Sequence, residues 1–168
     1  MRTLVTGGSG FFGTLLCEQL ASTGHAVTNL DISRPEDAVP GVTFLEADIR
    51  DVRLVQQACA DTDVVFHNVA QVPLAKDPEL FESVNSFGTA NLLRACERAG
   101  VRKVVYTSSS AVFGIPEANP VTETTPPRPV EAYGKAKLDG ELLCQAAITR
   151  GLDVSIVRPR TILGHGRL

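Results

Sequence analysis

The sequence predicts an α/β fold built on a doubly wound parallel sheet. Short apolar runs rich in β-branched residues alternate along the chain with longer segments of helical periodicity. Several of these runs are apolar on both faces, which is typical of parallel strands that helices cover on either side. A glycine-rich turn directly follows the first run, where folds of this class place a nucleotide-binding loop.

The predicted strands are short, apolar and bounded by turn residues. In chain order they are Thr3–Thr6, Ala26–Leu30, Val42–Glu46, Val64–His67, Lys103–Thr107 and Val154–Val157. The helices expected between them are Phe11–Ser22, Asp51–Ala60, Pro78–Ala99 and Ala132–Thr149. Gly100 is expected to end the third helix, and the proline-rich stretch Gly114–Pro129 to form an ordered surface loop.

Length and composition narrow the class of protein. A chain of 168 residues predicts one domain with a substantial core. With 43% hydrophobic residues, 21% charged residues and a net charge of −3, the chain is an improbable partner for nucleic acid. No apolar run is long enough to span a membrane and no signal-peptide pattern follows Met1, so a cytoplasmic location is expected. The scattered cysteines and histidines predict no metal site, and the cysteines are interpreted as small buried apolar residues.

The glycine-rich turn indicates a cradle for a dinucleotide. Gly7 permits a tight turn, Gly10 lets the backbone approach a pyrophosphate, and Gly13 allows the helix to pack closely on the strand. The phosphates would lie at the N-terminus of the first helix, beside Phe11 and Phe12.

Asp31 supports this interpretation and favours NAD over NADP. It ends the second predicted strand, 18 residues after Gly13 (31 − 13), where a carboxylate accepts hydrogen bonds from the adenosine ribose. The same negative charge repels a 2′-phosphate. The following residues Ile32, Ser33 and Arg34 are expected to border the ribose, and the Arg34 guanidinium is a possible partner for that phosphate.

Tyr133 and Lys137 form a candidate acid–base pair, four residues apart on one face of a predicted helix. A free phenol has a pKa of about 10 and is a poor base at neutral pH. An adjacent ammonium group stabilises the phenolate and lowers that pKa. The run Ser108–Ser110 follows the fifth predicted strand and offers a hydroxyl donor for a substrate oxygen.

These motifs, in this order, resemble the extended short-chain dehydrogenase/reductase family, in particular the NAD-dependent epimerase/dehydratases that act on nucleotide sugars. The resemblance runs from Met1 to about Gly166 and includes the glycine spacing of the turn. It implies a Rossmann fold, NAD as cofactor, a small-molecule substrate and hydride transfer at a secondary alcohol. Such proteins commonly form homodimers through two long helices, here Pro78–Ala99 and Ala132–Thr149. They usually continue well beyond this length, so residues 1–168 are expected to lack most of the C-terminal substrate-binding region.

The resemblance also implies roles for individual residues. Ser109 would hydrogen-bond the substrate oxygen, with Ser110 as the alternative, and Lys137 would also hold the nicotinamide ribose. Asp48 and Ile49 would contact the adenine. The remaining implied contacts with the cofactor are Val69, Ala70, Gln71, Asn85, Thr107, Pro159 and Ile162.

Three functions stay open at this point. A nucleotide-sugar epimerase is favoured over a dehydratase, because Ser110 and Ala111 stand where the sugar 4,6-dehydratases carry acidic residues. A hydroxysteroid-type dehydrogenase or reductase is the second possibility, and the mixed character of the expected pocket residues Gln71–Leu74 does not choose between them. A non-catalytic NAD-binding module is the third.

Overall fold

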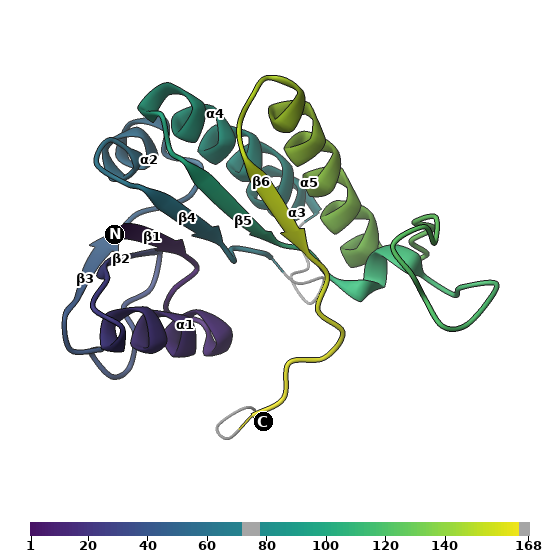
Figure 1. Ribbon diagram of the computed structural model, residues 1–168, viewed down its shortest axis with the longest axis horizontal. Helices are drawn as coiled ribbons and strands as arrows, with labels where there is room; N and C mark the ends of the chain where they lie inside the picture. Colours follow the sequence, from purple (N-terminus) through teal and green to yellow (C-terminus); the bar gives the residue numbers. More distant parts are fainter. Residues whose placement is uncertain (72–77, 165–168) are drawn as a thin grey trace.

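The computed structural model describes residues 1–71 and 78–164, so residues 72–74 of the expected pocket lie outside the described ranges. Six parallel strands form one sheet in the order β3-β2-β1-β4-β5-β6 (Figure 1). The strands are β1 (Arg2–Thr6), β2 (Ala26–Asp31), β3 (Val42–Glu46), β4 (Val64–His67), β5 (Lys103–Thr107) and β6 (Val154–Val157). The predicted doubly wound parallel sheet is confirmed.

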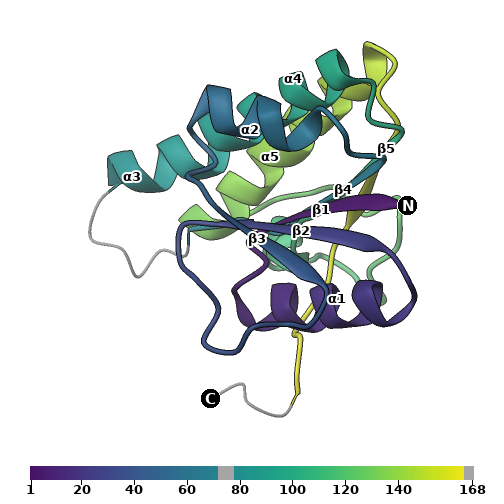
Figure 2. The same ribbon diagram turned by 90° about the vertical axis from the view of Figure 1, so that its left-hand side faces the viewer.

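Helices cover the two faces of the sheet unequally. They are α1 (Phe11–Ser22), α2 (Val52–Cys59), α3 (Pro78–Glu82), α4 (Thr89–Ala99) and α5 (Ala132–Thr149). Figure 2 shows α2, α4 and α5 on one face and α1 on the other. From β1 the chain adds β2 and β3 toward one edge of the sheet, and from β4 it adds β5 and β6 toward the other edge. The position between β1 and β4 is the topological switch point, where α/β sheets of this kind bind ligands beyond the carboxyl ends of their strands.

The larger part of the core lies between the sheet and the three helices. Leu4, Val65 and Val104 come from adjacent strands, and all three are fully buried against Leu92 of α4 and Cys144 of α5. A smaller cluster of Val5, Cys17 and Val27 joins α1 to the opposite face. This alternation explains why the strands are apolar on both sides.

The long helix predicted over Pro78–Ala99 is interrupted. A π-helical segment, η1 (Ser83–Gly88), separates α3 from α4. Periodicity does not reveal such a bulge, because one extra residue per turn barely changes the apolar pattern. Gly100 ends α4 in the left-handed conformation at φ 68°, as expected, and the sequence also missed a short 3₁₀ helix, η2 (Ser110–Phe113).

All four cysteines are buried, as interpreted from the sequence. Cys59 of α2 and Cys96 of α4 lie with their Sγ atoms 4.0 Å apart. Over residues 1–71 and 78–164 no helix has the length and apolar character needed to cross a bilayer. The same ranges contain no cluster of three or more His, Cys, Asp or Glu side chains suited to a metal ion.

Candidate active site

A cleft of about 310 Å³ lies at the switch point, beyond the carboxyl ends of the strands. It brings together residues from the ends of β1, β2, β3 and β4, which are far apart in the sequence. The predicted cofactor-binding residues that line it are Gly7, Gly10, Asp31, Ile32, Asp48, Ile49, Val69, Ala70 and Gln71.

The glycine-rich turn forms a tight backbone cradle. Gly7 adopts a left-handed conformation, at φ 72°, and its N–H donates to the Leu30 carbonyl at 2.9 Å. A Cβ atom at Gly13 would lie 2.1 Å from the Gly7 carbonyl oxygen, so no side chain fits there. The turn leads into the N-terminus of α1, where Gly10 occupies the N-cap and contributes no capping side chain. Such a helix N-terminus is suited to binding a phosphate group.

Asp31 is anchored at the edge of this cradle. One carboxylate oxygen accepts from the Ser9 N–H at 3.0 Å, and the other from the Ser33 N–H at 3.1 Å. The Arg34 guanidinium lies 4.9 Å from the centre of the Phe44 ring and lines a neighbouring hollow rather than the cleft. The Asp31 carboxylate therefore lines the cleft, whereas the Arg34 guanidinium, which could bind a 2′-phosphate, lies in the neighbouring hollow.

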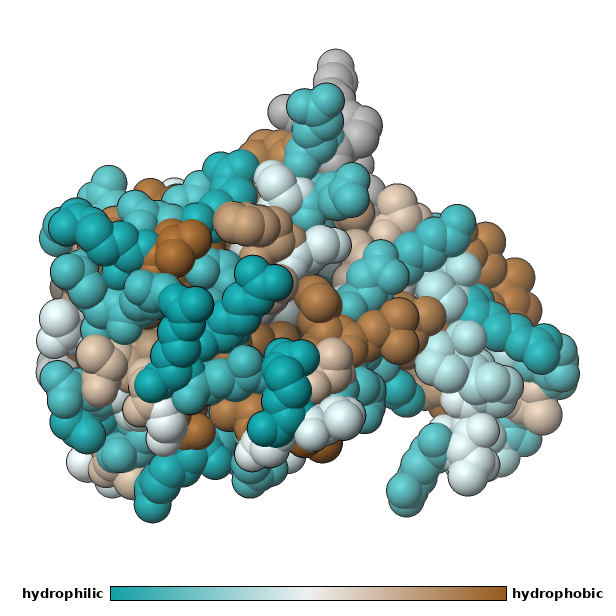
Figure 3. Space-filling view, turned by 90° about the horizontal axis from the view of Figure 1, so that it is seen from above, coloured by the Kyte–Doolittle hydropathy of each residue, from teal (hydrophilic) through white to brown (hydrophobic). Residues whose placement is uncertain are grey.

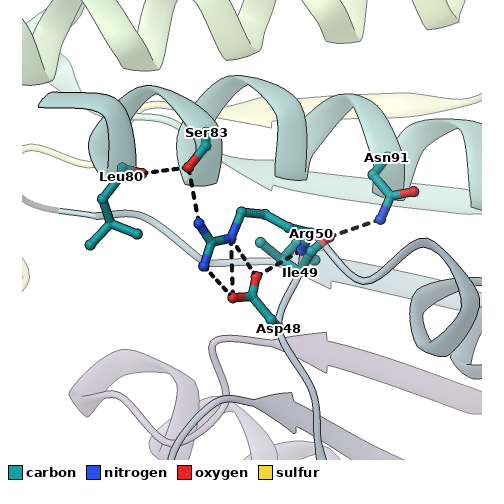
Figure 4. Close-up of polar contacts among 6 residues, drawn as sticks. All are labelled: Asp48, Ile49, Arg50, Leu80, Ser83 and Asn91. Carbon is teal, nitrogen blue, oxygen red and sulfur yellow. Dashed lines mark hydrogen bonds and ion pairs between the residues drawn. The ribbon is translucent and has the colours of Figure 1, made fainter.

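The loop after β3 carries an ion pair that the sequence did not predict (Figure 4). The Arg50 guanidinium donates to both oxygens of Asp48, at 2.6 to 3.1 Å, and the Arg50 N–H adds a further bond at 2.8 Å. These hydrogen bonds hold the pKa of the Asp48 carboxyl below its usual range. Arg50 also donates to the Ser83 hydroxyl at 3.1 Å, which connects the loop to η1. Asp48 therefore stays charged and fixed in the cleft.

Two further contacts hold this end of the cleft against the helices. Asn91 of α4 donates to the Ile49 carbonyl at 2.9 Å (Figure 4). Gly88 lies so close to Ile49 that a Cβ at Gly88 would approach the Ile49 side chain to 2.5 Å. Ile49 is 3% exposed and is thus fixed between the sheet and the π-helical segment.

Asn85 holds the loop after β4 by two hydrogen bonds. Its carbonyl oxygen accepts from the Gln71 N–H at 3.0 Å, and its amide donates to the Gln71 carbonyl at 3.3 Å. Asn85 lies in the π-helical segment and is buried. Such segments are frequent at functional sites, and here the Asn85 amide is bonded to Gln71, which lines the cleft.

Tyr133 and Lys137 lie on the first turns of α5, as predicted. The Lys137 ammonium donates to the Thr107 carbonyl at 2.7 Å and lies 6.0 Å from the centre of the Tyr133 ring. Lys137 is almost fully buried, and this burial lowers its pKa to about 8. The ammonium group thus connects the end of β5 with the helix that carries the phenol.

The 3₁₀ helix η2 brings the serines toward this pair. The Ser109 hydroxyl accepts from the Ala111 N–H at 3.2 Å, which fixes the start of η2. A Cβ at Gly134 would lie 2.5 Å from the Ala111 carbonyl oxygen, so a glycine beside Tyr133 lets α5 pack onto η2. The chain therefore brings the segments that carry Ser109, Tyr133 and Lys137 together.

Lys137 gives a testable pH dependence. Because its pKa is about 8 in the folded protein and about 10.5 in the unfolded chain, the unfolded state binds more protons between these values, and stability rises with pH there. At pH 7 the buried charge costs ~3 kcal/mol. Lys137→Met removes this cost but also loses the hydrogen bond to the Thr107 carbonyl. We therefore expect the variant to raise the free energy of unfolding at pH 7 by about 2 kcal/mol.

Urea unfolding of the wild type and the Lys137→Met variant at pH 7 and pH 10 measures this effect. The difference between the two proteins should shrink at the higher pH, where the lysine is neutral. Lys135→Met, at an exposed position of the same helix, serves as the control and should show no such change. An equal difference at both pH values would contradict the assignment.

Asn68 was missed by the sequence analysis, although it follows β4 directly. Among the described residues it is the only one that lines both the cleft and an apolar hollow of about 320 Å³ on the α1 side. Four predicted cofactor-binding residues line that hollow: Phe12, Thr107, Pro159 and Ile162. The Asn68 carbonyl oxygen accepts from the Thr107 hydroxyl at 2.7 Å, whereas its amide nitrogen is buried without a partner in residues 1–71 and 78–164. In the sequence, the only indication of a role for Asn68 was that a polar residue directly follows a strand.

The residues present fit a dinucleotide. The glycine cradle leaves room for a pyrophosphate, and Asp31 lies where a ribose would be bound. Between the two cavities Asn68 offers a buried donor that has no partner within residues 1–71 and 78–164. The Tyr133 and Lys137 pair lies beyond the end of β5, on the other side of the switch point. The fold and the cleft at its switch point are those of a dinucleotide-binding α/β domain.

Comparisons with known proteins identify the family. Residues 3–167 match the NAD dependent epimerase/dehydratase family, and the chain belongs to it. It is 55% identical over 165 residues to uncharacterized protein y4nG of Sinorhizobium fredii, covering 98% of this chain and 42% of that protein. It is 37% identical over 178 residues to the UDP-glucose 4-epimerase of Mycolicibacterium smegmatis, covering 98% of this chain and 57% of that enzyme.

A solved structure agrees with this assignment. The UDP-glucose 4-epimerase of Thermus thermophilus in complex with NAD superposes with a TM-score of 0.84 at 36% identity. The match covers 94% of this chain and 54% of that enzyme. The chain thus spans about half the length of the relatives it matches.

Proposed function

We propose that this chain is the cofactor-binding and catalytic part of an NAD-dependent epimerase that acts on a nucleotide sugar. The observation that carries the proposal is the convergence of three features at the carboxyl edge of one sheet. These features are the cradle closed by Gly13, the carboxylate of Asp31, and the buried Lys137 beside Tyr133. Most of the substrate contacts would lie in a region outside residues 1–168.

NAD, when bound, supplies the acceptor for a hydride. Tyr133, as phenolate, takes the proton of a substrate hydroxyl, and Ser109 donates a hydrogen bond to the same oxygen. Lys137 stabilises the phenolate, and its bond to the Thr107 carbonyl keeps the ammonium at the end of β5. In an epimerase Tyr133 later returns the proton, so the chain ends its cycle in its starting state.

Incubation of residues 1–168, extended by the proposed substrate-binding region, with NAD and UDP-galactose tests the proposal. Formation of UDP-glucose, followed by NMR, with no net accumulation of NADH, is the expected result. Accumulation of NADH with a hydroxysteroid and no reaction of the sugar would favour the dehydrogenase alternative. Binding of NAD without either reaction would favour a non-catalytic module.

Asp31 is proposed to set the preference for NAD. We expect Asp31→Asn to weaken NAD binding about 10- to 100-fold, because a charge-assisted hydrogen bond to the ribose contributes roughly 1.5–3 kcal/mol. NADP binding should become tighter, since the repulsion of its 2′-phosphate is removed. Titration calorimetry with both cofactors measures the ratio. Asp37→Asn, at an exposed position nearby, is the matched control, and an unchanged ratio in Asp31→Asn would contradict this role.

We also propose that the protein is a homodimer and is located in the cytoplasm. A groove between α4 and α5, lined in part by Leu93 and Leu143, supports an interface on this face. Figure 3 shows that the face carrying these helices has apolar patches between polar side chains. Sedimentation velocity should give the mass of a dimer for the chain, and a monomer at all concentrations would oppose this part of the proposal.

A further inference from the structure

A partly buried ion pair connects α5 with the end of β6 and takes no part in the steps above. Glu141 of α5 is 3% exposed. Its carboxylate accepts from Arg158 at 2.8 Å (Nε to Oε1) and at 2.6 Å (Nη2 to Oε2), and from the Ser108 hydroxyl at 2.5 Å. The side chains of Glu141 and Arg158 are 4% and 29% exposed. We call these three residues the Glu141 network.

Two members of the network directly precede proposed site residues at strand ends. Ser108 precedes Ser109 after β5, and Arg158 precedes Pro159 after β6. The backbone joins the same two segments, because the Ser110 N–H donates to the Pro159 carbonyl at 2.9 Å. The network therefore fixes the exits of two neighbouring strands against one carboxylate.

The third member connects these exits to the helix of the acid–base pair. Glu141 lies one turn after Lys137 and two turns after Tyr133 on α5. Close packing reinforces this contact, since a Cβ at Gly140 would lie 2.0 Å from the Tyr106 hydroxyl oxygen of β5. The exit of β5 before Ser109, the exit of β6 before Pro159, and the helix of Tyr133 and Lys137 thus meet at the Glu141 carboxylate.

The chemistry of the network favours a positioning role over a stabilising one. A buried ion pair loses much hydration, and its replacement by apolar residues is often neutral or stabilising. In return, the planar guanidinium and the carboxylate make a two-point contact with a defined geometry. Arg158 is further oriented by the ring of Phe113, whose centre lies 5.0 Å from the guanidinium carbon.

We propose that the Glu141 network is a positioning device that sets Ser109, the Tyr133 and Lys137 pair, and Pro159 in one arrangement around the nicotinamide half of the cofactor. Glu141, Arg158 and Ser108 are positioning residues that act through their neighbours. The inference rests on the proposed function, and it adds Glu141 and Arg158, which neither the motifs nor the cleft identified.

The variant Glu141→Leu/Arg158→Met tests this inference. It removes both charges together, so the net charge of the chain is unchanged and neither partner is left unpaired. The matched control is Glu97→Leu/Arg150→Met, which removes a partly exposed ion pair between α4 and the end of α5. Both variants first require a thermal melt and a circular dichroism spectrum to establish that they fold.

Two measurements then separate positioning from a purely structural role. The first is the NAD dissociation constant, which we expect to rise about tenfold, because the proposed contacts of Lys137 and Pro159 with the nicotinamide half would be displaced. The second is the titration of Tyr133 by tyrosinate absorbance. The chain has two tyrosines and no tryptophan, and burial raises the pKa of Tyr106 far above the accessible range. The Tyr133 midpoint should shift in the variant and stay in place in the control.

The outcomes are distinct. A folded double variant with wild-type NAD affinity and a wild-type Tyr133 midpoint would overturn the inference. If the double variant does not fold, Arg158→Lys decides by the same measurements, since it keeps the charge and loses the two-point contact. Failure of the wild type to bind NAD would instead count against the proposed function, and the Tyr133 titration would still test the network.

Discussion

Replacement of Gly13 by alanine is expected to abolish measurable NAD binding and to destabilise the fold. A Cβ at this position would lie 2.1 Å from the Gly7 carbonyl oxygen and 2.6 Å from the Gly8 Cα atom, both of which belong to the backbone. Relief of this clash requires α1 to move away from β1. Overpacking of this kind costs about 3 kcal/mol. The same movement opens the cradle, so NAD affinity should fall by about 100-fold or more.

Urea unfolding and titration calorimetry measure the two effects of Gly13→Ala. Gly10→Ala is the matched control, because its Cβ would meet only the Gly7 carbonyl oxygen at 3.6 Å, which is ordinary van der Waals contact. We expect this control to keep its stability and to weaken NAD binding, because Gly10 lines the cleft. Normal NAD binding by a folded Gly13→Ala protein would show that the cradle is not the pyrophosphate site.

Replacement of Tyr133 by phenylalanine is expected to remove catalysis while NAD binding remains. The change deletes the proposed acid–base group only, and general acid–base catalysis contributes about 10²–10⁴-fold to the rate. Tyr133 is half-buried at the start of α5, with the Lys137 ammonium 6.0 Å from its ring centre. The rate of epimerisation should therefore fall about 10³-fold, with little change in the NAD dissociation constant.

Tyr106→Phe is the control for this experiment. Tyr106 is the other tyrosine of the chain, its ring lies 5.2 Å from the Lys137 ammonium, and it is fully buried in β5. Burial raises its pKa, which opposes its use as a base. An equal loss of activity in both variants, or full activity in Tyr133→Phe, would contradict the acid–base role of Tyr133.

Periodicity and turn chemistry predicted most of the fold. The strands from Val42–Glu46 onward and the helices Phe11–Ser22 and Ala132–Thr149 have the expected bounds, and Asp51 forms the N-cap of α2 through a bond to the Leu54 N–H. The π-helical segment escaped prediction, and its last residue, Gly88, packs against Ile49, a residue from a distant loop. Such a contact leaves no local signature.

The residues of the candidate site also fall into those that the sequence predicted and those that it did not. Residues within a motif, such as Gly7 and Asp31, were found by spacing and now line one cleft. Arg50, Asn68 and Glu141 were missed, because their significance depends on partners that only the fold brings near. Arg50 pairs within its own loop and reaches η1, Asn68 borders two cavities, and Glu141 joins two strand ends. The catalytic roles of Ser109, Tyr133 and Lys137 stay predictions.

The most direct test of the account is titration calorimetry of the 168-residue chain with NAD and with NADP. The account predicts that NAD binds to one site per chain, that NADP binds more weakly, and that Tyr133→Phe binds NAD as the wild type does. Absence of binding by a folded chain, or equal binding of both cofactors, would contradict the central claim that the cradle and Asp31 form an NAD site.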